Sequence, residues 1–142
     1  LQEGCPGWMY QIKCGATTTW ERWDALKPDG TVNEEKMAGS GDNMVSFNHY
    51  AFGSVGEFYY QYILGIKPQK PGFAELHFEP YPDRRLGGVS GSYLSRAGKI
   101  ESSWKYEEDG CHISLNTPVK SEVVLPNGQR ETVEEGTYQW LC

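Results

Sequence analysis

The chain has 142 residues and a mass of 16.0 kDa, enough for one modest domain or for a small domain joined to part of another. Its formal charge of −6 at pH 7 divides evenly, with −3 in residues 1–68 and −3 in residues 69–142. Neither half therefore offers the basic face that nucleic acid or an anionic membrane surface requires. No run approaches the roughly eighteen apolar residues of a membrane-spanning helix. We expect a globular chain with neither kind of partner.

Aromatic residues are unusually frequent, at 13% of the chain, with five Trp and nine Tyr. Such side chains pack cores, but they also stack on sugar rings and line binding clefts. The chain begins at Leu1 and has no charged segment followed by an apolar run, so no signal peptide is indicated. We expect it to be a piece of something longer.

The cysteines and histidines do not have the spacing of a metal site. They are Cys5, Cys14, Cys111, Cys142, His49, His77 and His112. Structural zinc needs ligands in close pairs, and no C-x-x-C pair occurs, so we expect no metal and no cofactor. The cysteine pattern neither requires nor excludes disulfide bonds. No glycosylation sequon occurs, which leaves the compartment open as well.

The clearest helix in the sequence is predicted from about Phe47 to Leu64, where apolar residues recur every three or four positions. Ser46 is the predicted N-cap and Gly65 the predicted stop. Gly53 and Gly56 lie inside the pattern. Since glycine costs about 1 kcal/mol there relative to alanine, they predict a close approach by another backbone.

A second, shorter helix is predicted to begin near Thr18 or Thr19. Threonine is a good N-cap, and Glu21 and Asp24 favour the first turns. Residues 27–43 are rich in turn formers and predict a loop between the two helices.

Beyond Pro68 the pattern changes to short β-type runs separated by turns. Residues 67–72, with two prolines, predict a linker or a sharp connection. Strands are predicted at 73–78, 88–95, 99–107, 111–117, 121–126 and 137–140, with hairpin turns at 108–110 and 126–128. This spacing is typical of an antiparallel β-sandwich. The predicted fold class is α+β, with helices in residues 1–67 and the sandwich in residues 68–142.

The stretch with most chemical content is 15–24, in which Glu21 lies between Trp20 and Trp23 and beside Arg22. Tryptophans can form an apolar floor under a sugar, while a carboxylate accepts or donates a proton. In the alternative interpretation, both tryptophans belong to the core and Glu21 pairs with Arg22 on a helix end.

A second polar group enters the long predicted helix. Asn48 and His49 at its start can point into a cleft. In the alternative, His49 is buried and bonded to a backbone carbonyl. The acidic runs at 107–109 and 134–135 are interpreted as solvated charges at turns.

Three strings in this order resemble the C-terminal end of bacterial α-L-rhamnosidases. They are PGWMY at 6–10, GATTTWERW at 15–23 and SFNHYAFGSVGE at 46–57. The second half is similar more loosely, through residues 71–73, 79–80 and 98–100. The family consists of inverting glycoside hydrolases with an (α/α)6 barrel followed by a small β-sandwich. Residues 1–67 would then be the last barrel helices and loops.

The resemblance implies roles for particular residues. Glu21 matches the family's general base, and His49 matches a residue that contacts bound rhamnose. Trp20, Arg22 and Asn48 lie beside these two and are expected to be wall residues of the same substrate-binding site. Thr19 stands where an aliphatic residue is expected, which does not affect the chemistry.

The family's general acid lies upstream of this chain, so the isolated chain is expected to be inactive. The implied partners are a rhamnose-containing glycoside and the missing N-terminal part of the enzyme. We also expect self-association through the aromatic face of residues 47–66, which barrel neighbours would otherwise cover.

Two alternative functions stay open. One is another (α/α)6 hydrolase or lyase that acts on a different sugar. The other is a carbohydrate-binding sandwich, which a pocket on the sheet face lined by Trp104, Tyr106 or Trp140 would favour.

Overall fold

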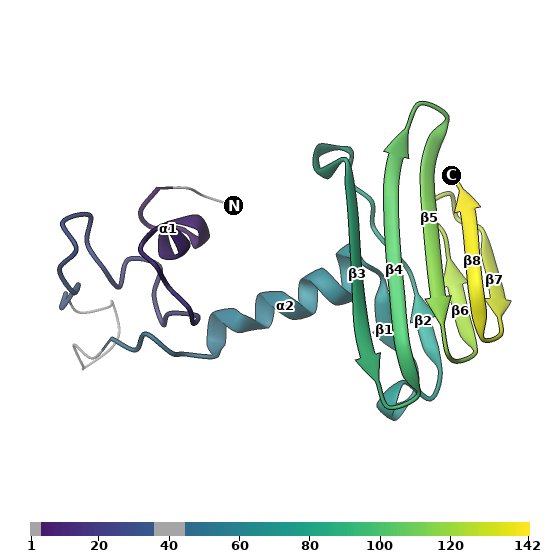
Figure 1. The fold of residues 1–142 in the computed structure, drawn as a ribbon, viewed down its shortest axis with the longest axis horizontal. Coiled ribbons are helices and arrows are strands. Elements are labelled where there is room, and N and C mark those ends of the chain that lie inside the picture. Colours follow the sequence, from purple (N-terminus) through teal and green to yellow (C-terminus); the bar gives the residue numbers. More distant parts are fainter. Residues whose placement is uncertain (1–3, 36–44) are drawn as a thin grey trace. The chain divides into compact units, whose positions relative to one another are not determined.

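The computed structural model describes residues 4–35 and 45–142, and the chain divides into two compact units, Leu1–Val55 and Gly56–Cys142 (Figure 1). The first unit contains short helices and loops, and the second contains two β-sheets. The predicted α+β class, helices followed by a β-sandwich, is confirmed. The domain boundary expected after residue 67 stays a prediction. Part of the loop expected at 27–43 lies outside the described residues.

The first unit has one α-helix that the sequence did not predict, α1 at Trp8–Lys13. The helix expected from Thr18 or Thr19 is wrong, because residues 17–24 form only bends and turns. Their backbone groups bond elsewhere: the carbonyl of Thr19 accepts from a residue thirty positions away, at 2.8 Å. Long-range pairing replaces the local bonds that a helix needs.

The long helical segment begins at Ala51, not at Phe47. It comprises η1 (Ala51–Ser54), α2 (Val55–Phe58) and η2 (Tyr59–Ile63), a 3-10 turn, an α-helical turn and a π-helical turn. The predicted cap at Ser46 is wrong, because the helical segment begins only at Ala51, and the bond that the Ser46 hydroxyl accepts from the amide of Asn48 lies in the loop before it. Residues 46–49 form bends and loop instead of a helix, and the Ser46 carbonyl and the His49 amide bond to residues 19–21.

The glycines of this segment were predicted correctly in one case and wrongly in two. Gly65 ends the helix with φ of +74°, in the left-handed region that favours glycine. The close backbone approach expected at Gly53 and Gly56 is wrong. A Cβ at Gly53 would meet only the Thr19 hydroxyl, at 3.9 Å, and one at Gly56 would meet nothing within 4 Å.

The second unit is a sandwich of two four-stranded sheets (Figure 1). One sheet has the order β1-β2-β6-β7, formed by Ile66–Pro68, Leu76–Phe78, Ser121–Val124 and Arg130–Val133. The other has the order β3-β4-β5-β8, formed by Gly88–Ser95, Gly98–Glu107, Gly110–Thr117 and Gly136–Leu141. Short 3-10 turns, η3 at Pro71–Phe73 and η4 at Arg84–Leu86, join strands. The pairing is antiparallel throughout except between β2 and β6, which are parallel.

Of the two alternatives for residues 67–72, the linker is wrong and the sharp connection is confirmed, since the segment contains the end of strand β1 and the η3 turn that leads back to the antiparallel strand β2. Strand β7 was missed as well. The other predicted strands are all present. Both hairpin turns are confirmed, and Gly128 in the second one has φ of +86°.

The sandwich core joins both sheets to the end of the helical segment. Its buried side chains are Leu64, Ile66, Leu76, Phe78, Ile100, Trp104, Cys111, Ile113, Leu115, Val123, Leu125 and Val133. The hydroxyl of Ser102 donates to the carbonyl of Leu64 at 2.6 Å, and the indole of Trp104 donates to the carbonyl of Ile63 at 2.7 Å. These carbonyls end a helix and have no partner within it. Strand β4 thus caps the helix.

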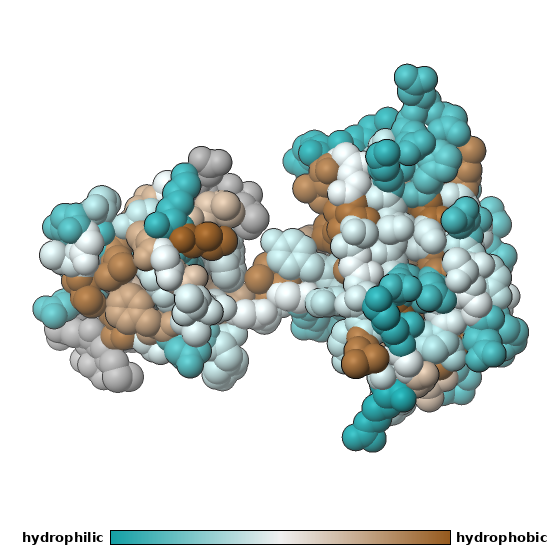
Figure 2. Space-filling view, in the orientation of Figure 1, coloured by the Kyte–Doolittle hydropathy of each residue, from teal (hydrophilic) through white to brown (hydrophobic). Residues whose placement is uncertain are grey.

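Outside this core the surface is mixed. Figure 2 shows hydrophilic side chains over much of the sandwich unit, interrupted by separate apolar patches. No helix among residues 4–35 and 45–142 is long and apolar enough to cross a membrane. All four cysteines are free thiols, and Cys111 lies opposite Cys142, with both backbone hydrogen bonds formed between them.

Candidate active site

Backbone hydrogen bonds bring together the two strings that carry the predicted site residues. The amide of His49 donates to the carbonyl of Thr19 at 2.8 Å, and the amide of Glu21 donates to the carbonyl of Ser46 at 2.9 Å. Two segments far apart in the sequence therefore run side by side within the first unit. Trp20 and Glu21 come from one of them, and Asn48 and His49 from the other.

A backbone amide holds the Glu21 carboxylate in place. Its Oε2 accepts the amide N–H of Ser46 at 2.8 Å, so the side chain and the main chain of Glu21 bond to the same residue. The side chain is half-buried. A charge-assisted bond of this kind orients a carboxylate firmly. The amide of Ser46 is a partner that sequence reasoning missed, because a backbone donor leaves no mark in the residue pattern.

Arg22 does not provide the ion pair that the alternative interpretation gave to Glu21. Its guanidinium binds Asp24 through two bonds of 2.6 and 2.8 Å, and it also donates to the carbonyl of Glu35 at 2.8 Å. This hydrogen-bonded pair holds the pKa of Asp24 below its usual value and raises that of Arg22. Asn33 donates to the same carboxylate at 3.0 Å. Arg22 thus ties the loop around Asn33 to the segment that carries Glu21.

Trp20 is a core residue in this chain, as the alternative interpretation proposed. It is 4% exposed, and its ring meets Phe47 edge to face at 5.2 Å between centroids. Its backbone amide donates to the side chain of Gln11 on α1 at 3.2 Å. Trp20 is therefore a buried side chain that supports the two paired segments.

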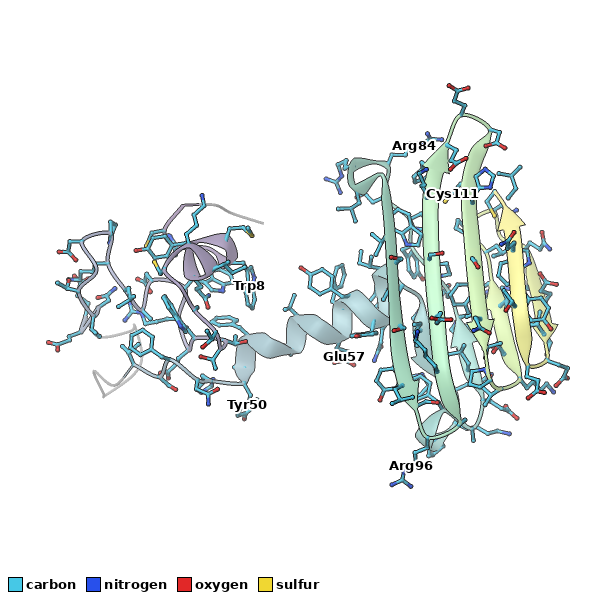
Figure 3. All side chains as sticks on the ribbon, in the orientation of Figure 1. Trp8, Tyr50, Glu57, Arg84, Arg96 and Cys111 are labelled. Carbon is cyan, nitrogen blue, oxygen red and sulfur yellow. The ribbon has the colours of Figure 1, made fainter. Side chains whose placement is uncertain are left out.

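Trp23 lies in a separate aromatic cluster. Its ring stacks on Phe52 at 5.0 Å and tilts against Trp8, labelled in Figure 3, at 5.9 Å. The indole nitrogen of Trp23 and the side-chain amide nitrogen of Gln11 are buried with no partner among the described residues.

His49 is oriented by the backbone that follows it. Its Nδ1 accepts the amide N–H of Ala51 at 3.2 Å, and its ring stacks on Tyr50 at 5.4 Å and an angle of 6°. Since Nδ1 accepts, a neutral imidazole here carries its proton on Nε2 and presents a donor there. The alternative interpretation placed a backbone carbonyl against His49. The structure instead shows a backbone amide that donates to its ring. Asn48 beside it is exposed.

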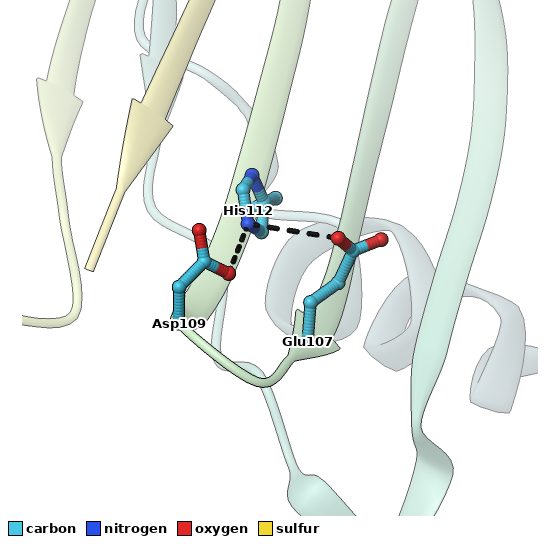
Figure 4. Close-up of side chains that lie close together, drawn as sticks. All are labelled: Glu107, Asp109 and His112. Carbon is cyan, nitrogen blue, oxygen red and sulfur yellow. Dashed lines mark hydrogen bonds and ion pairs between the residues drawn. The ribbon is translucent and has the colours of Figure 1, made fainter.

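One group of side chains in the described residues has the composition of a metal site. Glu107, Asp109 and His112 converge at the β4–β5 turn, where His112 Nε2 lies 2.7 Å from Asp109 Oδ1 and 3.8 Å from Glu107 Oε2 (Figure 4). The hydrogen bond to Asp109 raises the pKa of His112. All three are exposed, and His112 pairs with both acids. The group matches the solvated turn charges expected from the sequence.

The carbohydrate-binding alternative finds a cavity at the expected place. A cavity of about 750 Å³ lies along β3, β4, β5 and β8, and its lining includes Trp104, Tyr106 and Trp140. Trp104, however, is 1% exposed, and its indole N–H is bonded within the core. It offers no open platform to a sugar.

Comparison with known families gives matches along nearly the whole chain. Residues 1–63 match the model of the bacterial alpha-L-rhamnosidase 6 hairpin glycosidase domain, and residues 65–139 match that of the bacterial alpha-L-rhamnosidase C-terminal domain.

Curated relatives share the same name. An alpha-L-rhamnosidase of Alteromonas sp. (strain LOR) is 38% identical over 89% of this chain, and one of Streptomyces avermitilis is 33% identical over 96%. The chain spans 13% of the length of each.

Solved structures are similar as well. The native rhamnosidase of Aspergillus terreus matches 98% of this chain with a TM-score of 0.81 and 33% identity. The Streptomyces avermitilis enzyme, solved in complex with L-rhamnose, matches 97% with a TM-score of 0.78 and 29% identity. The chain covers 16% and 15% of these two structures.

Proposed function

Since this chain belongs to the bacterial α-L-rhamnosidase family, we propose that it works as part of an enzyme that releases terminal α-L-rhamnose from glycosides with inversion. The chain is a small share of each relative's length, so the activity is proposed for the complete protein. The general acid would come from outside residues 1–142. The isolated chain is then inactive, and its exposed aromatic side chains, Phe58 and Tyr62 among them, would favour self-association.

The observation that carries the proposal is the bond from the Ser46 amide to Glu21 Oε2. An inverting hydrolase needs one acid to protonate the leaving oxygen and one carboxylate to take a proton from the attacking water. We assign the second role to Glu21, with Oε2 held by Ser46 and Oε1 accepting the proton. The water oxygen then forms the new bond to the anomeric carbon as the glycosidic bond breaks.

The other predicted residues divide into two groups. His49 Nε2–H would donate to a sugar hydroxyl, and the exposed amide of Asn48 would bind beside it. Trp20 and Arg22 lie in the second group, because one is buried and the other is bonded to Asp24. We propose that they keep the wall of the site in place.

The test is Glu21→Gln in the complete protein with an aryl α-L-rhamnoside. The amide still accepts the Ser46 N–H, so folding should be kept, but it cannot take a proton from water. We expect kcat to fall about 10²–10⁴-fold, with little change in KM or melting temperature. Glu35→Gln, the same change at an exposed carboxylate of the same unit, is the control and should leave kcat unchanged.

His49→Ala should raise KM more than it lowers kcat, because a positioning bond is lost. A folded Glu21→Gln enzyme with near-wild-type kcat would remove Glu21 from the base role. Binding of rhamnosides by the complete protein without any turnover would favour a carbohydrate-binding module instead, with the 750 Å³ cavity as its site.

A further inference from the structure

A second, smaller cavity lies within the sandwich unit, away from Glu21 in the sequence. Its volume is about 300 Å³. Residues of the helical segment, β1, η3 and β3 line it: Glu57, Tyr60, Gln61, Ile66, Pro68, Phe73 and Tyr93. Figure 3 labels Glu57 on the helical segment. Three of the seven are aromatic, and a single one carries a charge.

Two of the three rings, Phe73 and Tyr60, each contact Tyr93 without being parallel to it. Phe73 and Tyr93 lie 4.8 Å apart with 40° between their planes, and Tyr60 and Tyr93 lie 5.8 Å apart with 70° between theirs. Rings arranged in this way form walls of a box, not one flat platform. We call these three residues the aromatic box.

Backbone strain helps to build the box. Phe73 has φ of +60°, and it is the one non-glycine residue with positive φ in the part of the chain that the structure describes. A bulky residue rarely adopts this conformation unless its surroundings hold it there. Here the conformation sets the ring of Phe73 against Tyr93.

A carboxylate supplies the polar group of the cavity. The Gln61 side chain donates to Glu57 Oε1 at 2.6 Å, which orients the acid. A negative charge in the lining of the same cavity as three aromatic rings is complementary to an organic cation, since ring faces attract positive charge. A sugar fits less well, because its many hydroxyls would meet few polar partners here.

The same chain already shows this combination filled by a cation. The ammonium group of Lys67 lies 5.1 Å from the ring centroid of Tyr62 and 5.3 Å from that of Tyr81, and it pairs with Glu79 at 2.7 Å. The aromatic box has equivalent parts, rings and one carboxylate. No lysine or arginine among the described residues lines it.

We propose that the aromatic box of Tyr60, Phe73 and Tyr93 binds an organic cation, an ammonium or guanidinium group, with the charge held by Glu57. Such a group can come from a protein side chain or from a free quaternary ammonium compound. The proposal does not depend on the rhamnosidase activity, since none of its residues has a part in the proposed reaction.

The test is a titration of the 142-residue chain followed by the aromatic NMR signals of the box, at a concentration where the chain is monomeric, because self-association through residues 47–66 would also shift Tyr60. The probes are tetramethylammonium chloride and N-acetyl-arginine amide, with tert-butanol as a neutral probe of similar bulk. We expect saturable shifts of Tyr93 and Phe73 with the cations and none with the alcohol. Tighter binding of the arginine probe would identify a side chain as the occupant, and tighter binding of tetramethylammonium a free cation.

The Glu57→Gln variant removes the negative charge but keeps the shape of the side chain, because the amide oxygen still accepts the hydrogen bond from Gln61. We expect it to weaken cation binding about fivefold at low salt. Glu108→Gln, at an exposed turn position, is the matched control and should change nothing. Tyr93→Leu should abolish the saturable shifts.

Three results would overturn the proposal. They are equal shifts with tert-butanol and the cations, unaltered cation binding in Glu57→Gln, and shifts that never saturate. If Tyr93→Leu fails to fold, Glu57→Gln still decides the matter.

Discussion

Replacing Trp104 with phenylalanine tests the joint between the helical segment and the sandwich. The indole N–H donates to the carbonyl of Ile63 at 2.7 Å, and the side chain is 1% exposed. Phenylalanine fills most of the space but cannot donate. An unpaired buried carbonyl costs about 1–3 kcal/mol. The smaller ring leaves a void that adds about 1–2 kcal/mol.

We therefore expect Trp104→Phe to lower the free energy of unfolding by roughly 2–5 kcal/mol. The measurement is urea unfolding of the 142-residue chain, followed by NMR signals of the sandwich so that the first unit does not contribute. Trp140→Phe is the control. Trp140 is itself half-buried and its indole donates to the half-buried carboxylate of Glu131, so the smaller ring leaves less void and water can replace the lost bond; the cost should stay near 1 kcal/mol or less. Equal losses in both variants would refute the capping argument.

Two further predictions concern Gly65 and Glu79. A Cβ at Gly65 would lie 2.3 Å from the backbone nitrogen of Pro80 with φ at +74°, so Gly65→Ala should cost about 3 kcal/mol or more in the same urea assay. Gly128→Ala, at φ of +86° but in open space, should cost about 1 kcal/mol, and equal costs would contradict the clash. The hydrogen bond from Lys67 lowers the pKa of Glu79 from 4.5 to about 2. Ionised Glu79 therefore stabilises the folded state fully above pH 4.5, and this stabilisation is lost as the pH falls toward 2. In the Lys67→Met variant, the melting temperature should depend less on pH between these limits. An unchanged pH dependence would exclude the Lys67–Glu79 pair as its cause.

The strands were the most predictable part of the fold. Residues 88–95 were predicted and found with the same bounds, because the strand is long and ends at clear turns. Strands β1 and β7 were missed, since three or four residues are too few for an alternating pattern. β1 also ends on Pro68, which reads as a break in the sequence.

The start of the long helix could not be predicted from local pattern. Its apolar spacing extends back to Phe47, but the His49 amide is bonded to Thr19, thirty residues away. That bond keeps residues 46–49 out of the helix. A tertiary contact therefore overrides a periodicity that by itself favours helix.

The contacts of the candidate site were also beyond what a local sequence pattern can predict. The residues themselves were evident from the sequence strings, whereas the bond from Ser46 to Glu21 joins positions 25 apart and uses a backbone donor. Asp24 lies two residues from Arg22, close enough in the sequence to be proposed as its partner. The sequence favoured the adjacent Glu21 instead, because neighbours in sequence are the simplest pair to propose.

The choice of partners has a chemical consequence for Glu21. A carboxylate bonded to a guanidinium through both of its oxygens has neither oxygen left to accept a proton from water. Here the guanidinium of Arg22 is occupied by both oxygens of Asp24, while Glu21 is oriented by a neutral backbone amide. The pairing keeps the arginine as structural support, and in the role proposed for Glu21 its Oε1 would accept a proton from water. We expect an Asp24→Asn variant of the complete protein to weaken the hold on Arg22, free it to pair with Glu21 and lower kcat on an aryl α-L-rhamnoside; an unchanged kcat would contradict this reasoning.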